Sequence, residues 1–273
     1  MSQVIIIRYS EIALKGSNRN LFESKLASNI EGFLEMHSIP YSSIKRPRGR
    51  IICHLANNIE PEQIQFLENV PGIASFNLAE SCNADVEKIK SRCLSQFPKQ
   101  TKSFRVSVSR VDKSFHLKSM ELERVIGDII IEKYNTPVSL KNFDTEIIVE
   151  ILGGQAYISV GTRHKGQGGL PVGITGVVIV AYTSSKSDEA ARLVMKRGCK
   201  VMPVMVGKNI TPEIDKYDCS ADKPEKVNSI SELNGLAEEK GIRAVVFDVR
   251  YPEIPRFRQL IKKDILVLFP LAI

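Results

Sequence analysis

The chain has 273 residues, 43% of them hydrophobic and 25% charged, which excludes a largely disordered protein and a small disulfide-stapled domain. Lys and Arg outnumber Asp and Glu by 38 to 31, giving a net charge of +7 that favours polyanionic partners such as nucleic acid or an anionic membrane. Five cysteines without zinc spacing indicate a reduced, cytoplasmic protein, and the first apolar run meets charge at Arg8, too soon for a signal peptide or membrane span.

Two α+β units are predicted before residue 165. In the first, β-branched strands at residues 4–9 and 50–54 flank a helix with apolar spacing at 20–33. The second alternates short helical and strand-like patterns. Its elements are predicted at residues 61–67 (helix), 73–79 (strand), 85–96 (helix), 103–109 (strand), 119–133 (helix) and 145–160 (hairpin).

Positive charge is concentrated in two stretches. Residues 45–50 contain four basic residues and no acid, which is typical either of a solvated turn or of a phosphate contact. Between residues 99 and 118, six basic residues face one acid, Asp112. Strand alternation places Arg105 on the solvent side of the strand at 103–109. These six are Lys99, Lys102, Arg105, Arg110, Lys113 and Lys118.

A glycine-rich connection at residues 163–171 separates these units from a different pattern. It is predicted to be either a flexible hinge or a segment whose backbone amides bind anions. Apolar strands then alternate with helices, which predicts a parallel sheet covered on both faces, with ligands expected near residues 182–187 and Gly207. The strands are predicted at 177–181, 200–206, 244–249 and 265–269, and the helices at 188–196, 229–240 and 257–263.

Four motifs point to a family. They are RYSEIALKG at residues 8–16, VPGI at 70–73, SFRV with RVDKSF at 103–115, and GGLPVG at 168–173. In order and spacing they resemble the tRNA 4-thiouridine synthetases over residues 4–180. The resemblance implies an α+β and α/β multidomain protein: a ferredoxin-like domain (1–58), a THUMP RNA-binding domain (59–165), and a Rossmann-like parallel α/β domain of the PP-loop type (173–273).

The resemblance also implies partners, cofactors and sites. The first two domains would hold a tRNA acceptor end, the third would use ATP and magnesium, and the chain would form a homodimer. The predicted RNA-binding residues are Arg105, Arg110, Lys113, Lys118, Arg163 and Lys165. The predicted nucleotide- or anion-binding residues are Ala181, Tyr182, Thr183, Ser184, Ser185, Lys186 and Ser187.

The last third departs from the family. Where the family has a Ser-Gly-Gly-x-Asp-Ser phosphate loop, this chain has residues 182–187, with Thr183 and Ser184 in the glycine positions and Lys186 in place of the acid. Amino acids with a Cβ fit a phosphate loop poorly, and Lys186 cannot hold a metal. Residues 248–255 lack the family's glycines, glutamine and cysteine. No catalytic or metal-binding residue is predicted, although a helix N-terminus near residue 188 should still bind anions weakly.

Three hypotheses remain. The first is a tRNA-binding accessory or inactive paralogue, and the second an active ATP-dependent tRNA sulfurtransferase with a rebuilt loop and a separate sulfur-donor protein. The third is a nucleotide-binding regulator. Of the cysteines, Cys199 is predicted to be a buried hydrophobe. Cys219 is predicted to be an accessible thiol whose pKa is raised by the acids on either side of it.

Overall fold

The computed structural model describes residues 2–111, 113–161, 163–207 and 210–272. The chain forms two compact units, and each draws on several segments of the sequence. The first unit contains Met1–Arg8, Ile39–Gln65 and Ser75–Lys165, and the second contains Tyr9–Ser38, Phe66–Ala74 and Gly166–Ile273.

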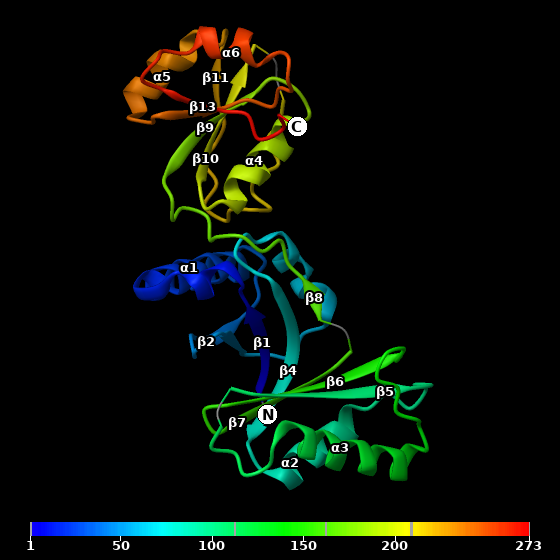
Figure 1. Ribbon diagram of the computed structural model, residues 1–273. Coiled ribbons are helices and arrows are strands. Elements are labelled where there is room, and N and C mark those ends of the chain that lie inside the picture. Colours follow the sequence, from blue (N-terminus) through cyan, green and yellow to red (C-terminus); the bar gives the residue numbers. More distant parts are fainter. Residues whose placement is uncertain (1, 112, 162, 208–209, 273) are drawn as a thin grey trace. The chain divides into compact units, whose positions relative to one another are not determined.

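One mixed sheet contains all the strands of the first unit (Figure 1). Its strand order is β2-β3-β1-β4-β7-β6-β5, with β8 also pairing with β4. The pairs are antiparallel apart from β5 and β6, which run parallel. The strands are β1 (Ser2–Arg8), β2 (Tyr41–Lys45), β3 (Ile51–Leu55), β4 (Ser75–Asn83), β5 (Phe104–Arg110), β6 (Thr145–Leu152), β7 (Gln155–Val160) and β8 (His164–Lys165).

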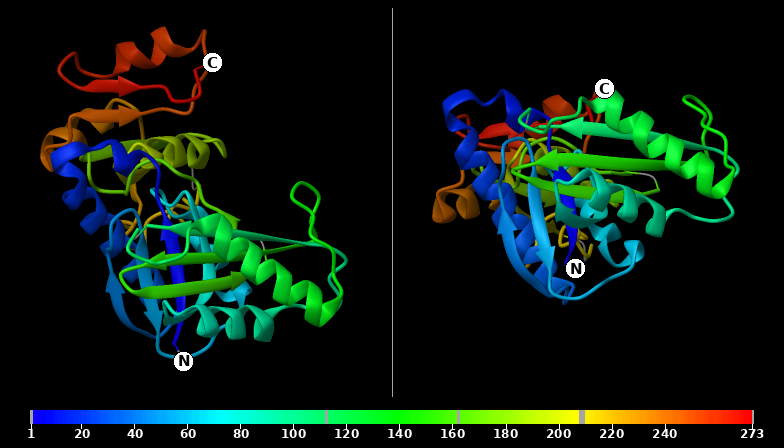
Figure 2. Two further views of the ribbon diagram at one scale, coloured as in Figure 1. Left: turned by 60° about the horizontal axis from the view of Figure 1, so that its bottom comes forward. Right: turned by 90° about the horizontal axis from the view of Figure 1, so that it is seen from below.

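Two helices, α2 (Val86–Gln96) and α3 (Ser119–Tyr134), cover one face of the β5–β6–β7 part of this sheet (Figures 1 and 2). Asp85 caps α2 by accepting a hydrogen bond from Lys88 N at 3.0 Å. Because apolar side chains recur on one side of each helix, they pack as a single core against alternate strand residues. Fully buried members of this core are Ile89, Cys93, Phe104, Leu122, Ile126, Ile130, Ile147, Val149, Ala156 and Ile158.

A parallel sheet forms the centre of the second unit, with strand order β11-β10-β9-β12-β13. The strands are β9 (Val177–Tyr182), β10 (Lys200–Val206), β11 (Glu225–Val227), β12 (Ala244–Val246) and β13 (Leu266–Leu268). The helices are α1 (Arg19–Met36), α4 (Ser187–Lys196), α5 (Glu232–Lys240) and α6 (Ile254–Leu260). Short 3-10 helices occupy Glu11–Leu14, Gly16–Asn18 and Pro61–Asn69. The last of these begins in the first unit and ends in the second.

Both faces of the parallel sheet are buried, which confirms the prediction made from its apolar strands. Alternate residues of β9 divide between two cores, with Val180 facing α4 and Ile179 facing α5 and α6. The edges of the elements differ from prediction. Helix α6 starts at Ile254, because Pro255 is acceptable in a first helical turn, and the three-residue strand β11 lacks an apolar run that would have revealed it.

Candidate functional site

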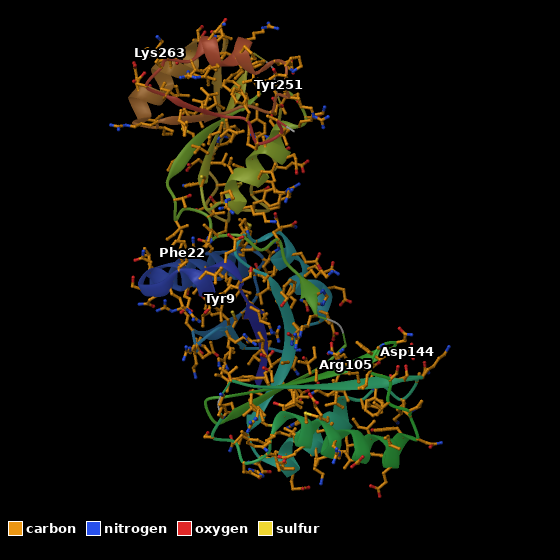
Figure 3. The ribbon with its side chains drawn as sticks, viewed as in Figure 1. Tyr9, Phe22, Arg105, Asp144, Tyr251 and Lys263 are labelled. Atoms are coloured by element: carbon orange, nitrogen blue, oxygen red, sulfur yellow. The ribbon has the colours of Figure 1, made fainter. Side chains whose placement is uncertain are left out.

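Arg105 reaches the surface of β5 (Figure 3), but neighbouring groups hold its guanidinium. It forms an ion pair with Glu146 on the adjacent strand, at 3.1 Å between nitrogen and oxygen. Nε donates to Ser107 Oγ at 2.9 Å, and the guanidinium lies 5.1 Å from the centre of the Phe143 ring. With 39% of its side chain exposed, Arg105 can meet a ligand, but its charge is already matched by a carboxylate.

Arg110, at the end of β5, shapes the loop that follows. Its Nη1 donates to the backbone oxygen of Phe115 at 2.8 Å. Its Nε is buried and has no hydrogen-bond partner within the described part of the chain. Arg110 therefore positions the basic loop and is not simply a free cation.

Four further cations offer unmatched charge: Lys113, Lys118, Arg163 and Lys165 are exposed. Within residues 2–111, 113–161, 163–207 and 210–272, no carboxylate forms an ion pair with any of these four side chains. Asp112, the acid that the sequence places in this stretch, lies outside the described residues. These four side chains are thus better placed than Arg105 to contact a polyanion.

Arg8 is buried in a polar cluster of the first unit. Its guanidinium contacts Glu150 and donates to Asn77 Oδ1 at 2.6 Å. Arg50 completes the cluster by bonding the other Glu150 oxygen at 2.7 Å, and Asn77 donates to Ser159 at 2.8 Å. Burial, with the nearby charge of Arg163, lowers the pKa of Arg8 to about 9, so it stays charged at neutral pH. Arg8 is therefore internal, Arg50 is partly buried, and Glu150 is a partner that sequence reasoning missed.

Within the glycine connection, residues 166–170 form a hydrogen-bonded segment, called the strap here. Gly72 N donates to Gly168 O at 2.8 Å, and Gly168 N donates back to Ile73 O at 2.7 Å. The Gly168 amide already donates to a carbonyl oxygen, so it has no hydrogen left to bind an anion. Further bonds join Gly166 N to Ala74 O (3.0 Å), Leu170 N to Lys196 O (2.9 Å), Gln167 Nε2 to Asn69 O (2.7 Å) and Arg192 Nη1 to Gln167 Oε1 (3.1 Å).

The predicted phosphate-loop region lies between β9 and α4, at the carboxyl edge of the parallel sheet. Three of its hydroxyl groups, those of Thr183, Ser184 and Ser187, donate to one carboxylate, Asp248, which follows β12. Thr183 Oγ1 and Ser184 Oγ each lie 2.6 Å from an Asp248 oxygen, and Ser187 Oγ lies 2.8 Å away. Asp248 is 6% exposed and Ser187 is fully buried. No local pattern in the sequence indicates this cluster, because 61 to 65 residues separate Asp248 from the three hydroxyl residues.

The neighbouring positions of this region are divided between core and surface. Tyr182 is fully buried and donates to Asp188 Oδ1 at 3.0 Å. Burial and the Asp188 carboxylate raise the pKa of the Tyr182 hydroxyl well above its usual range. Ala181 is also fully buried, whereas Ser185 and Lys186 are at the surface. Of the seven predicted residues, the structure therefore brings Thr183, Ser184 and Ser187 together around Asp248.

Cys199, predicted to be a buried hydrophobe, and Cys219, predicted to be an accessible thiol, are both half-buried. Cys199 lies beside the core on the α4 side and contacts Thr175 Oγ1 at 3.4 Å. Cys219 packs against α1, where a Cβ on Gly32 would lie 2.4 Å from its Sγ. Burial, followed by the charge of Asp218, raises the pKa of the Cys219 thiol. This direction agrees with the prediction, and it makes Cys219 a poor nucleophile at neutral pH.

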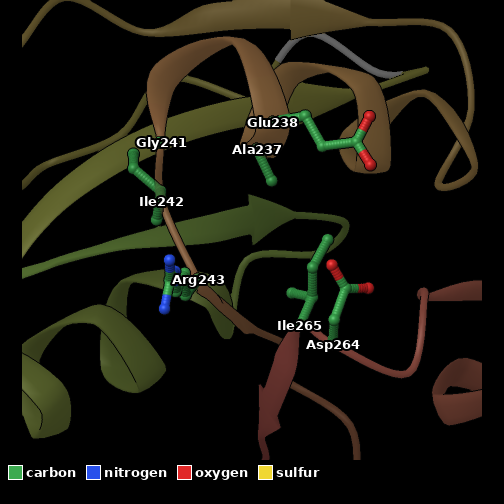
Figure 4. Close-up of a pocket in the computed structure, with 7 residues that line it drawn as sticks. All are labelled: Ala237, Glu238, Gly241, Ile242, Arg243, Asp264 and Ile265. Atoms are coloured by element: carbon green, nitrogen blue, oxygen red, sulfur yellow. The ribbon is translucent and has the colours of Figure 1, made fainter.

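A surface depression of about 510 Å³ lies at the opposite edge of the parallel sheet (Figure 4). Arg243 and Ile265 line it just before β12 and β13 begin, so it is remote from the Asp248 cluster at the other ends of these strands. Among the described residues, no group of three or more His, Cys, Asp or Glu is arranged to hold a metal ion. No helix in the described ranges is long and apolar enough to span a bilayer.

Two family profiles match the first part of the chain. The ThiI ferredoxin-like domain matches residues 4–77, and the THUMP domain matches residues 83–161. Among curated relatives, a probable tRNA sulfurtransferase of Thermococcus kodakarensis is 35% identical over 76% of this chain and 56% of its own length. A probable tRNA sulfurtransferase of Geobacillus thermodenitrificans is 36% identical over 73% of this chain and 50% of its own length. The chain thus spans about half the length of the curated relatives it matches.

Solved structures extend the likeness to the whole fold. PH1313 from Pyrococcus horikoshii is 31% identical and has a TM-score of 0.85, covering 100% of this chain and 95% of its own. A 4-thiouridine synthetase, solved as an RNA complex with bound ATP, has a TM-score of 0.79 at 20% identity, covering 100% of this chain and 81% of its own. The second match shows a shared fold alone, because its sequence identity is low.

Proposed function

The chain belongs to the tRNA 4-thiouridine synthetase family, and from this premise we propose that it is a cytoplasmic tRNA-binding protein that does not thiolate tRNA by itself. It docks the acceptor end of tRNA through its THUMP region and acts as an accessory or inactive paralogue. A sulfur-donor protein and a second copy of the chain are the further partners that the family suggests.

The observation that carries RNA binding is the unmatched charge of Lys113, Lys118, Arg163 and Lys165. These cations are exposed and have no ion-pair partner in the described part of the chain. Lysine and arginine that are not already neutralised release counterions when they meet phosphates, and this release supplies affinity without reading base sequence. Such contacts suit a module that recognises the shape of an RNA end.

The phosphate-loop region supports the absence of turnover. Thr183 and Ser184 stand where the family has glycines, and the exposed Lys186 stands where it has an acid. The backbone amides of Thr183 and Ser184 point to Ser187 Oγ, at 3.2 and 3.3 Å. These donors are therefore engaged inside the protein. Losing one preorganised donor commonly costs about a hundredfold in rate, and here several are engaged.

One observation favours the second hypothesis, an active sulfurtransferase with a rebuilt loop. In the family an acid stands at the position of Lys186. In this chain the carboxylate of Asp248 lies beside the loop instead. The two hypotheses differ in turnover: the active enzyme would show tRNA-dependent ATP–pyrophosphate exchange with magnesium, and the tRNA-binding protein would show none. The nucleotide-binding regulator would bind ATP without regard to tRNA.

The test of RNA binding compares unmatched with matched cations. Lys113→Ala together with Lys165→Ala should weaken tRNA binding and lower the slope of log affinity against log salt by roughly one unit per lost contact. Arg105→Ala should change the slope less, because Glu146 already neutralises Arg105. The control is Lys240→Ala on α5, where the lysine pairs with Glu225 at 2.9 Å. A slope that the double variant leaves unchanged, in a protein with wild-type circular dichroism, would contradict RNA binding by these residues.

A further inference from the structure

The Asp248 cluster joins two neighbouring strands at one edge of the sheet. Val246 on β12 lies beside Val180 on β9 in parallel register, so the segments that follow both strands emerge together. Asp248 comes two residues after β12, and the loop hydroxyls come directly after β9. One Asp248 oxygen accepts from Thr183, and the other accepts from Ser184 and Ser187.

The loop has few donors left for an external ligand. Besides the two amides that point to Ser187 Oγ, Lys186 N donates to Ser184 Oγ at 3.1 Å. Ser187 N donates to the Ser184 carbonyl at 3.2 Å. Phosphate loops bind their ligand through such amides and through the start of the following helix. Here these amides are used internally, and the hydroxyls of Thr183, Ser184 and Ser187 donate to the carboxylate of Asp248.

A buried carboxylate needs compensation, and three hydroxyl donors with a helix N-terminus supply it. The compensation is neutral: the hydroxyls and amides carry no net charge, so the negative charge of Asp248 persists at the place where a phosphate would have to bind. Like charges brought together in this way repel each other and weaken binding. Among the described residues, Lys186, whose side chain is exposed, forms no ion pair with Asp248.

We propose that Asp248 determines which ligands this loop accepts. Its carboxylate accepts the hydrogen bonds of the loop hydroxyls and repels anions, so it excludes inorganic phosphate and nucleotide phosphates. The carboxyl edge of the sheet in the wild-type protein is then closed to phosphate ligands, and their rejection depends on one side chain. This inference concerns the α/β part of the chain and is independent of RNA binding by the THUMP region.

The experiment measures the binding of inorganic phosphate, and of ATP with magnesium, to the full chain. Titration calorimetry gives the affinity, and the amide chemical shifts of Ser184 and Ser187 report binding at the loop. Asp248→Ala removes the carboxylate and frees the hydroxyls of Thr183 and Ser184, while Ser187 Oγ can still donate to the Ser184 carbonyl at 2.8 Å. We expect it to bind inorganic phosphate at least roughly tenfold more tightly than the wild type, since the repulsion is gone. Asp248→Asn, which keeps the shape but removes the charge, should fall between the two. Affinity for tRNA should stay the same in both variants.

Asp264→Ala is the matched control, because it removes an exposed carboxylate at the opposite edge of the sheet. It should gain no phosphate binding, which separates the local effect from the change in net charge. The proposal is overturned if the folded Asp248→Ala protein binds phosphate no better than the wild type. It is equally overturned if the wild type binds ATP or Mg²⁺ alone at this loop and Asp248→Asn loses that binding, since Asp248 would then be a ligand. Should both variants unfold, shifts of Ser184 and Ser187 in the wild type decide: a response to phosphate contradicts the proposal, and none supports it.

Discussion

Two buried carboxylates, one in each unit, are stabilised in different ways. Glu150 in the first unit is 2% exposed and lies between the guanidinium groups of Arg8 and Arg50. Asp248 in the second unit is 6% exposed and accepts hydrogen bonds from three neutral hydroxyls. The first arrangement pairs the carboxylate with two cations, whereas the second only solvates its negative charge. A cluster of the first kind therefore holds the fold together, and one of the second kind also sets up a field that acts on ligands.

The largest effect is expected from Glu150→Ala. Removing this carboxylate leaves Arg8 buried with an uncompensated charge, and breaking a buried pair in this way costs about 3–5 kcal/mol. Urea unfolding followed by circular dichroism measures the loss. The control is Glu225→Ala, which breaks the more exposed pair with Lys240 and should cost less than about 1 kcal/mol. Equal losses of unfolding free energy in the two variants would show that the buried Glu150 cluster contributes no more stability than an exposed ion pair.

An intermediate effect is expected from Asp248→Asn. The amide nitrogen cannot accept from a hydroxyl, so at least one of the three donors loses its acceptor, at a cost of about 1–3 kcal/mol. The loss should be smaller than that of Glu150→Ala, because no charged partner is stranded. The same urea titration decides the ranking, with the exposed Asp264→Asn as a control that should stay within about 0.5 kcal/mol of the wild type. A loss larger than that of Glu150→Ala would reverse the comparison.

The smallest effect on stability is expected at a third buried carboxylate, Asp218, which is 4% exposed. One of its oxygens accepts from Ser220 N and Oγ, at 2.9 and 2.8 Å, and the other has no partner among the described residues. Asp218→Asn should change the free energy of unfolding by less than about 1 kcal/mol, since its amide nitrogen replaces an oxygen that had no donor.

The same substitution has a second expected result, at Cys219. Asp218 helps to raise the pKa of this thiol, so removing its charge should lower that pKa and increase the thiolate fraction at pH 8. Alkylation of the Cys219 peptide by iodoacetamide, followed by mass spectrometry across pH 7 to 10, should then show a faster rate and a titration at lower pH. An alkylation rate that does not change would mean that burial alone sets the pKa.

Local patterns in the sequence were sufficient to predict the parallel sheet and most helices. The apolar run of β9 and the spacing in α4 indicate a buried strand followed by an amphipathic helix, and both are present. Strand β2 was missed because it is short and mostly polar, and it runs into the basic stretch at residues 45–50. Element types followed from periodicity, and element edges followed less well because caps and prolines decide them.

The candidate site was less predictable, because it depends on contacts between residues far apart in the sequence. The sequence identified Thr183, Ser184 and Ser187 as a loop, but Asp248 joins them only through the register of β9 and β12. Arg105 was correctly placed at the strand surface, whereas its pairing with Glu146 required the parallel alignment of β5 and β6. Charge counted along the sequence therefore overestimates the charge that is free to meet a ligand.

The close packing of the strap indicates where the backbone of this chain can and cannot be cut. A Cβ at Gly169 would lie 2.3 Å from the Lys196 carbonyl oxygen, and one at Gly166 would lie 2.3 Å from that of Ile73. A protease needs backbone that is free of such neighbours, so the glycines here do not mark a cutting point, despite their composition. The exposed turn at Gly153 and Gly154 has open space around both positions. New chain ends, a fluorescent reporter or a circular permutation belong at that turn.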